Sequence, residues 1–284
     1  MCKKKEKVIE KSFDIGGSLA GSLAGATVGA VAGPLGIVAG ALLGTAAEQA
    51  IIVVGNEIKD RILSKRESQR VGIVYQIAGE KINANIEAGK LIRDDGFFED
   101  EEGNRAPGEE ILEGILLVAQ REYEEKKLKY LGNLYANIVF EKEISPQNAN
   151  ALIKVAESLT YRQLCAIRVI VLFQDLPANQ LKKTAYRRVS GTNNISIVSE
   201  IFDLYQKSLL GSSDAILSAA GINPSKLRVV GNGAWLYKLM ELHTIPRDDL
   251  LEIIEVLTGK TIPKTAEARE DIVDGEAKAA AVFT

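Results

Sequence analysis

The stretch Ile15–Ala47, with the sequence IGGSLAGSLAGATVGAVAGPLGIVAGALLGTAA, contains no ionisable side chain over 33 consecutive residues. The chain as a whole has 284 residues, of which 26% are charged and 46% are hydrophobic, so chance does not account for so long an uncharged run. About 20 apolar residues suffice to span a bilayer as a helix. This stretch therefore decides the expected fold, a membrane segment joined to a helical body.

Glycines recur at every fourth residue within the stretch, in two series that flank Pro34. The first series is Gly17, Gly21, Gly25, Gly29 and Gly33, and the second is Gly36, Gly40 and Gly44. Residues four apart lie on one face of a helix, so each series forms a flat stripe that another backbone can approach closely. In water each glycine would cost roughly 0.5 to 1 kcal/mol relative to alanine, whereas lipid forces the backbone to hydrogen-bond internally. The series predict glycine-zipper packing of membrane helices.

The motif Gly33-Pro34-Leu35-Gly36 predicts a turn, because proline removes a helix hydrogen bond and glycine permits tight backbone angles. Two transmembrane helices, 15–33 and 35–55, would each be roughly 28 to 32 Å long, close to the hydrocarbon thickness. Positive residues flank both ends: Lys3, Lys4, Lys5, Lys7 and Lys11 before the stretch, and Lys59, Arg61, Lys65, Arg66 and Arg70 after it. Because positive flanks stay on the cytoplasmic side, we expect a hairpin in the inner (cell) membrane with both termini cytoplasmic. The alternative is a Gly/Ala-rich helical hairpin packed in the core of a soluble protein.

Glu48 is the one acid that falls well inside the second predicted helix. A carboxylate within the bilayer is costly and usually faces a bundle interior or water, which makes Glu48 a candidate pore-lining or intramembrane acid. Alternatively, Glu48 marks the membrane interface and the hairpin inserts only shallowly.

The rest of the chain reads as a mainly α body. We expect a basic flank over 1–14, the hairpin over 15–56, a helical domain over 57–158, a second helical module over 159–260 and a disordered, Ala-rich tail over 261–284. Residues 94–103 predict a solvated acidic loop, and apolar spacing predicts one long helix from Pro107 to Phe140 with the pairs Glu122–Lys126 and Glu125–Lys129 on its exposed face. Ser145-Pro146 and Thr160 with Gln163 are helix-start signals.

The module 159–260 has the order helix (161–174), helix (194–210), two short apolar runs (215–219 and 227–230), and a helix through Trp235. This order is compatible with a winged-helix-like module. Lys182, Lys183, Arg187 and Arg188, beside Tyr186, form the one basic cluster suited to an anionic contact. Nucleic acid is the less favoured partner, because the chain carries a net charge of -3 and a pI near 5.5. A solvated loop, an anionic lipid or a protein contact are the alternatives.

The composition disfavours common enzyme designs. Cys2 and Cys165 are far apart, and His243 is the only histidine, so neither a disulfide framework nor a zinc site is expected, and a catalytic triad would depend on His243 alone. Cys165 falls among apolar residues of a predicted helix and reads as a buried structural residue. We find no phosphate loop, nucleophile elbow or metal-ligand spacing. The sequence therefore predicts no enzyme, cofactor or metal, although carboxylate chemistry of an unrecognised kind is left open.

The two glycine series resemble the glycine-zipper hairpins of bacterial membrane proteins. The motif 130–137, YLGNLYAN, together with 144–146, 159–164 and 236–240, is similar to poorly characterised prokaryotic proteins, some of which resemble membrane effectors of anti-phage defence systems. The resemblance covers about residues 15–258 and brings no catalytic residue with it. It implies a pore-forming toxin whose oligomerised hairpins permeabilise the membrane in abortive infection, with membrane lipid, further copies of the chain and a cytoplasmic sensor protein as partners. A membrane-anchored helical scaffold or adaptor that binds a protein partner is the alternative.

Overall fold

The computed structural model describes residues 46–59, 61, 63–100, 104–174, 181–186 and 191–260, and within these ranges the chain is mainly helical, as predicted. Most of the predicted hairpin, the basic flank 1–14 and the tail 261–284 lie outside the described residues. Among the helices that are described, none combines the length and apolar character needed to cross a bilayer.

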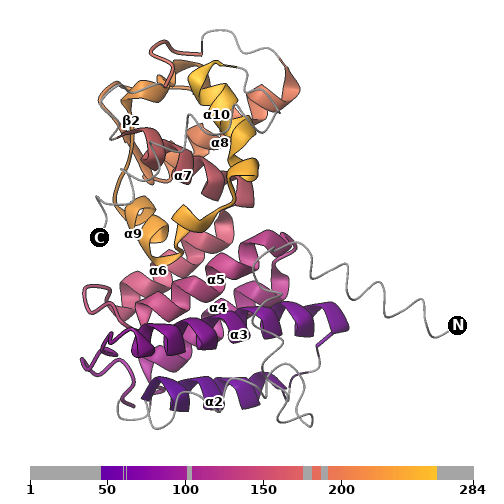
Figure 1. The fold of residues 1–284 in the computed structure, drawn as a ribbon, viewed down its shortest axis with the longest axis vertical. Coiled ribbons are helices and arrows are strands. Elements are labelled where there is room, and N and C mark those ends of the chain that lie inside the picture. The colour runs from indigo at the N-terminus through magenta and orange to yellow at the C-terminus, as the bar shows by residue number, and fades with distance from the viewer. Residues whose placement is uncertain are drawn as a thin grey trace, which may run out of the picture.

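Five helices form the half of the molecule that follows the glycine stretch (Figure 1). They are α2 (Ala46–Lys59), α3 (Lys65–Glu87), α4 (Pro107–Arg121), α5 (Glu125–Ile138) and α6 (Pro146–Ser158). Helix α3 packs along α5, and α4 contacts both α2 and α6. Gly132 on α5 permits the close α3 contact, because a Cβ at this position would lie 2.7 Å from Cγ2 of Ile77.

In the described residues of the other half there are four α-helices, short 3-10 turns and one strand pair. Its elements are α7 (Tyr161–Gln174), α8 (Thr192–Gln206), β1 (Leu210–Ser212), β2 (Leu227–Val229), α9 (Asn232–Leu239) and α10 (Leu251–Thr258). Strands β1 and β2 pair antiparallel, with Gly211 opposite Arg228. One cluster of buried apolar side chains runs through both halves. Helix α2 lies at one end of the long axis of the molecule, and α8, α10 and β2 lie at the other (Figure 1).

Two helix starts follow the predicted capping signals. The Ser145 side chain accepts a hydrogen bond from the Asn148 backbone N–H at 3.2 Å, and Pro146 occupies the first turn of α6. At the start of α7, the Gln163 backbone N–H donates to the Thr160 hydroxyl at 3.2 Å, and the Gln163 side chain accepts from the Thr160 N–H at 2.9 Å. Each signal lies within three residues of the chain, so the sequence was sufficient to predict it.

The predicted single helix 107–140 is wrong, because the chain breaks between α4 and α5 at residues 122–124. Glu122 takes an extended backbone conformation, and its Oε1 accepts a hydrogen bond from the Glu124 N–H at 2.9 Å. The Glu122 carboxylate pairs with Lys127 at 2.6 Å, in place of the predicted partner Lys126, which pairs with Asp249 instead. The Asp249 partner of Lys126 is 123 residues away in sequence, so helical periodicity carries no information about it.

The first predicted apolar run, 215–219, is not a strand. Strand β1 comes earlier, at Leu210–Ser212, where Leu210 is buried beneath the pair. In the apolar run, Ile216 is buried, whereas Leu217 is 93% exposed. Strand β2 falls within the second predicted run, 227–230.

The acidic loop near residues 94–100 is held to the body more tightly than predicted. Asp94 pairs with Lys142, and Asp95 pairs with the buried Arg93 at 2.5 Å. The Phe97 ring is buried, with the Arg93 guanidinium 4.2 Å above its centre. Asp100 accepts a hydrogen bond from the Ala106 N–H at 3.2 Å. These contacts give the loop a structural role.

Helix α3 begins with a capping box formed by Ser64 and Glu67. Hydrogen bonds from the Ser64 side chain, the Gln120 side chain and the Ser64 backbone lower the pKa of Glu67 from 4.5 to about 2. Because the pKa falls on folding, the stabilisation is present above pH 4.5 and is lost as the pH falls towards about 2.

We therefore expect Glu67 to titrate near pH 2 in the folded chain, as measured by the carboxyl carbon shift in NMR. Substitution Ser64→Ala should raise this midpoint towards 4.5, because it removes the largest stabilising hydrogen bond of the carboxylate. Substitution Ser68→Ala, at an exposed serine one turn further along α3, should leave it unchanged. A midpoint near 4.5 in the unaltered chain would contradict the capping box.

Candidate functional site

The sequence-predicted site residues are only partly visible. The membrane-packing residues Gly17, Gly21, Gly25, Gly29, Gly33, Gly36, Gly40 and Gly44 lie outside the described residues, as do Arg187 and Arg188. Glu48 belongs to α2, although its side chain is outside the described part of the structure. The candidate site that can be built from contacts is the helix into which the glycine stretch continues.

Helix α2 buries one apolar stripe in the body. Ala47, Ile51, Val54 and Ile58 are each at most 3% exposed and recur at the spacing of one helix face. They pack in the core, chiefly against α4. We call this contact, together with Tyr75 of α3, the α2 interface. The last residues of the predicted second membrane helix, 46–55, thus belong to a helix docked on the body.

Tyr75 and Gly55 make the closest contact of the α2 interface. The Tyr75 hydroxyl donates a hydrogen bond to the backbone carbonyl of Ile51 at 2.9 Å. Gly55, one turn later on α2, leaves room for the ring, because a Cβ there would lie only 2.5 Å from the Tyr75 hydroxyl oxygen. Burial raises the pKa of Tyr75 to about 12, so the hydroxyl keeps its donor proton at physiological pH.

Ion pairs hold the C-terminal end of α2. Arg105 contacts Glu57 of α2 at 2.7 Å and, at the same time, Glu109 at 3.0 Å and Glu113 at 2.7 Å. Arg61, which follows α2, also pairs with Glu113. Partial burial would raise the pKa of Glu113, but hydrogen bonding and charge from Arg61 and Arg105 outweigh burial and keep that pKa below its usual value. Such a network orients the helix end more firmly than an isolated surface pair would.

The junction between the two halves is built from side chains of the motif 130–137. Asn133 of α5 donates to the Met240 carbonyl at 3.1 Å, and Asn137 donates to the Leu239 carbonyl at 2.8 Å. These bonds satisfy carbonyls at the end of α9, which have no partner within that helix. Arg168 of α7 donates to the carbonyls of Leu242 and His243, which follow α9. The motif therefore has a structural role at this junction.

His243 and Cys165 have no arrangement typical of catalysis. Desolvation lowers the pKa of the half-buried His243, and burial raises the pKa of the Cys165 thiol to about 12. A thiol with so high a pKa is not a nucleophile near neutral pH. Cys165 lies in α7 within the core, which confirms the expected burial.

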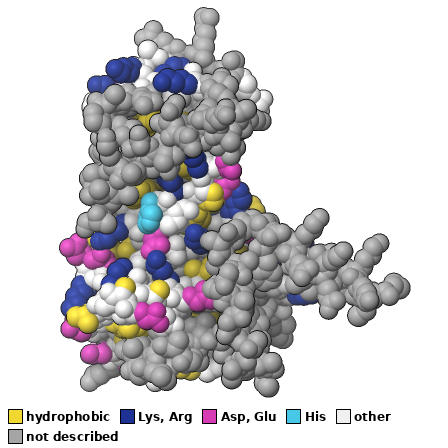
Figure 2. Space-filling model, in the orientation of Figure 1, with side chains coloured by type: hydrophobic (Ala, Val, Ile, Leu, Met, Phe, Trp, Pro, Cys, Tyr) yellow, Lys and Arg dark blue, Asp and Glu magenta, His cyan; other side chains and the backbone are white. Residues whose placement is uncertain are grey.

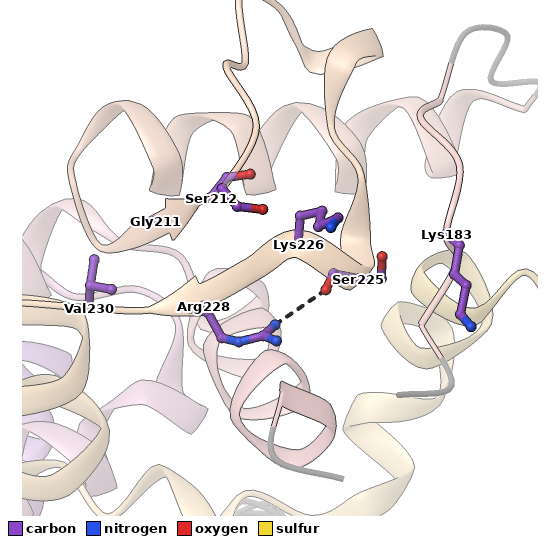
Figure 3. A pocket seen from close by; sticks show the side chains of 8 residues that line it. Lys183, Gly211, Ser212, Ser225, Lys226, Arg228 and Val230 are labelled. Atoms are coloured by element: carbon purple, nitrogen blue, oxygen red, sulfur yellow. Dashed lines mark hydrogen bonds between the residues drawn. The ribbon is translucent and has the colours of Figure 1, made fainter. Parts of the chain in front are cut away.

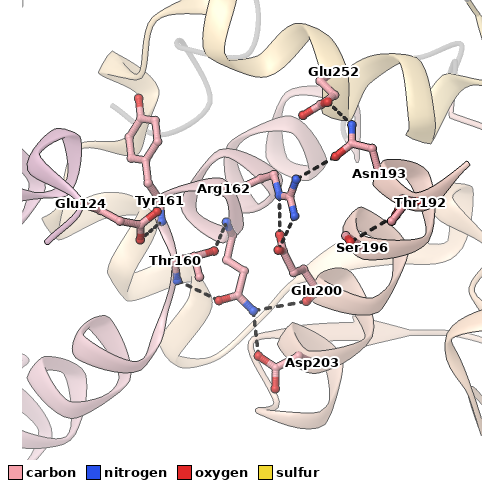
Figure 4. A network of polar contacts seen from close by, with 11 residues as sticks. Glu124, Thr160, Tyr161, Arg162, Thr192, Asn193, Ser196, Glu200, Asp203 and Glu252 are labelled. Carbon is pink, nitrogen blue, oxygen red and sulfur yellow. Dashed lines mark hydrogen bonds and ion pairs between the residues drawn. The ribbon is translucent and has the colours of Figure 1, made fainter. Parts of the chain in front are cut away.

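A polar network joins α7, α8 and α10 (Figure 4). The Arg162 guanidinium binds both carboxylate oxygens of Glu200, at 2.8 and 2.6 Å. It also donates to Asn193 at 3.0 Å, and Asn193 in turn donates to Glu252. Because these carboxylates already accept bonds from fixed donors, the network is suited to holding helices together.

Of the predicted basic cluster, the structure describes Lys182, Lys183 and Tyr186. The Lys182 ammonium lies 4.7 Å from the centre of the Tyr186 ring, whereas Lys183 is exposed and lines a cleft beside β2 (Figure 3). Lys226 and Arg228 line the same cleft, and neither belongs to the predicted basic cluster. Their alternation across Leu227 is the available signal, because residues two apart share one face of a strand.

Comparison with known proteins adds no relative: no family model, curated protein or solved structure matches this chain. Within the described ranges, no three His, Cys, Asp or Glu side chains are grouped so that they could hold a metal ion.

Proposed function

We propose that this protein is a membrane-associated effector whose glycine-zipper hairpin, 15–56, oligomerises and permeabilises the membrane. The observation that carries the proposal is the uncharged run Ile15–Ala47, which continues into a helix that the body holds by one buried stripe and by ion pairs. A flexible tether would anchor the body but could not transmit its orientation. A docked helix can do so, since α2 cannot rotate without breaking the α2 interface.

The proposed mechanism couples the body to the hairpin through α2. A sensor protein that brings several bodies together would also bring together the hairpins that precede these bodies in the chain. The glycine faces then allow close packing between hairpins. Glu48 belongs to the docked helix α2, so in this mechanism it would mark the membrane interface, the second of the two positions expected for it from the sequence. The resemblance to anti-phage effectors favours abortive infection as the setting. The winged-helix-like description of 159–260 also remains a proposal.

The decisive experiment measures membrane potential in cells that express the full chain. We expect depolarisation with the unaltered protein and its loss in the variant that combines Gly21→Leu, Gly25→Leu and Gly29→Leu. Leucine makes the segment more apolar, so insertion should be kept, while its bulk prevents close helix contact. Membrane fractionation and cross-linking of the same cells measure insertion and oligomerisation separately.

A matched control places leucines at the same spacing beside the stripe, as Ser22→Leu, Ala26→Leu and Ala30→Leu. This variant should keep oligomers and depolarisation. The unaltered chain and both triple variants could all insert without depolarising the cell. That result would favour the alternative function, a membrane-anchored scaffold that binds a protein partner, over the effector. A full chain that stays in the soluble fraction would contradict both.

A further inference from the structure

An open cleft of about 720 Å³ lies beside the strand pair (Figure 3). It is lined by the cationic side chains of Lys183, Lys226 and Arg228 and by the serines Ser212, Ser213 and Ser225. The volume is in the range of small-molecule sites, about 300 to 1,000 Å³. Cations and hydroxyl groups are both hydrogen-bond donors. The Ser225 hydroxyl already donates to the Asn223 side chain at 2.9 Å, so the donors that face a ligand are the three cations and the hydroxyls of Ser212 and Ser213. Such a lining is suited to a ligand rich in acceptor oxygens.

Two of the cations are exposed at the start of β2: Arg228 belongs to the strand, and Lys226 ends the 3-10 turn just before it. Lys226 and Arg228 alternate with Leu227, which is buried beneath the sheet. Gly211 lies opposite Arg228 in the register, so no side chain from β1 covers the guanidinium. A Cβ at Gly211 would lie 3.2 Å from Cγ1 of Val230, so the glycine makes room for the Val230 side chain, which also lines the cleft.

Hydrogen bonds tie the opposite wall of the cleft to the segment that precedes β2 and to α10. The Ser225 N–H donates to the Lys182 carbonyl, and the Asn223 side chain donates to the Lys183 carbonyl, both at 3.2 Å. The Lys182 N–H in turn donates to the carbonyl of Leu257 in α10, at 2.8 Å. Lys183 is therefore held beside Lys226 and Arg228, although it is more than 40 residues away from them in sequence.

The Arg228 guanidinium is oriented before any ligand arrives. One terminal nitrogen donates to the carbonyls of Leu227 at 2.7 Å and Ser225 at 3.3 Å. Within the described residues, Nε and the other terminal nitrogen have no protein acceptor. The Ser212 hydroxyl oxygen accepts from the Asp214 N–H at 3.1 Å, which leaves its own proton available for donation. Preorganised donors of this kind reduce the entropy cost of binding.

The three cations lack the carboxylate partners that cations have elsewhere in the fold. No described carboxylate lies within 4.0 Å of Lys183, Lys226 or Arg228, whereas Arg105 alone contacts three. At this end of the molecule, the described side chains in view include Lys and Arg without neighbouring acids (Figure 2, top). In a chain of net charge -3, such a grouping concentrates positive potential at one concave site.

We propose that this cleft binds the phosphate group of a small soluble ligand. Arginine, lysine and hydroxyl donors around one cleft match the tetrahedral oxygens of phosphate. A soluble source is favoured over a lipid headgroup, because the cleft lies at the end of the molecule remote from α2, where the glycine stretch joins (Figure 1). A concave site with three cations is also unlike the extended basic face that tracks a nucleic acid backbone. The inference does not depend on the proposed membrane function.

The test is calorimetric titration of the full chain, in micelles of an uncharged detergent, with inorganic pyrophosphate at low salt. We expect saturable binding at one site. Substitutions Lys226→Ala and Arg228→Ala should each weaken it by about tenfold or more, because a hydrogen bond to a charged group contributes about that factor. Substitution Lys154→Ala removes an exposed lysine of α6, far from the cleft in the fold, and should leave the affinity unchanged.

Absence of pyrophosphate binding, or equal binding by all variants, would overturn the proposal. Two further arms identify other sources of phosphate. Binding to vesicles that contain phosphatidylglycerol, but neither to phosphatidylcholine vesicles nor to pyrophosphate, would assign the cleft to lipid headgroups if it requires Lys226 and Arg228. Duplex DNA binding that requires the same residues and resists pyrophosphate would assign it to nucleic acid. Either result replaces the soluble ligand.

Discussion

Substitution Lys127→Met should lower the free energy of unfolding by about 3 to 5 kcal/mol, because it leaves a buried carboxylate without its cation. The Lys127 side chain is 2% exposed and that of Glu122 is 7% exposed, and their charged groups are 2.6 Å apart. The Lys127 ammonium also donates to the Glu157 carbonyl of α6 at 3.1 Å. Methionine keeps most of the length of the lysine chain, so the loss reports the charge and its hydrogen bonds more than the packing. Chemical denaturation of the full chain, followed by circular dichroism, measures it.

Arg121 provides the matched control for this pair. It contacts Glu157 at 2.8 Å, but its side chain is 67% exposed, so Arg121→Met should cost no more than about 1 kcal/mol. The double substitution Lys127→Met with Glu122→Gln should recover part of the stability, because no unpaired charge remains buried. Equal losses in Lys127→Met and Arg121→Met would show that burial does not strengthen the Glu122 pair.

The same pair shows why the sequence did not predict the break between α4 and α5. Apolar residues keep a helical spacing through 107–140, so the periodicity does not indicate the interruption of the helix. The break depends on partners distant in sequence: Lys127 reaches Glu157, and the Glu124 side chain accepts from the Tyr161 N–H at 2.9 Å. Starts of α6 and α7 were predictable because donor and acceptor are three residues apart.

The candidate sites show the same difference between features that a local sequence pattern predicts and contacts that form only between distant residues. The glycine series was predicted from its spacing, and Glu48 from its place inside the second predicted membrane helix. Neither observation indicates which surface that helix contacts. The contact between Tyr75 and Ile51 joins residues that are 24 apart in sequence, so no local sequence pattern predicts the α2 interface. Lys183 was singled out by its basic neighbours, whereas Lys226 and Arg228 joined it only once the chain had folded.

Substitution Gly55→Leu should detach α2 from the body while leaving the remaining helices folded. The new Cβ would lie 2.5 Å from the Tyr75 hydroxyl oxygen and 2.9 Å from the ring carbon that bears it, so the ring must leave its place. Overpacking of a well-packed site costs about 1 to 3 kcal/mol. The loss of stability should be confined to α2, because the buried stripe of α2 is short and the rest of the body keeps its own core. Amide hydrogen exchange should therefore accelerate across α2, by about tenfold for each 1.4 kcal/mol, and remain unchanged in α5.

Substitution at a second helical glycine, Gly114, serves as a control, because it changes a glycine within a helix without causing a steric clash. A Cβ at Gly114 of α4 would meet only the Ile153 side chain, at an ordinary 3.7 Å, so Gly114→Ala should stabilise its helix slightly, whereas Gly55→Ala should already loosen α2. Substitution Tyr75→Phe keeps the ring and removes only the hydrogen bond to Ile51, for a loss of about 1 kcal/mol. Unchanged exchange in the Gly55 variants would mean that α2 is not held through Tyr75.

If the proposed coupling is right, Gly55→Leu should still insert into membranes but no longer depolarise them, since a hairpin joined to a loose α2 cannot follow the orientation of the body. Full depolarisation by a chain whose α2 exchanges freely would show that the hairpin acts without the body, and the docked helix would then be a structural end of the fold and no part of the mechanism.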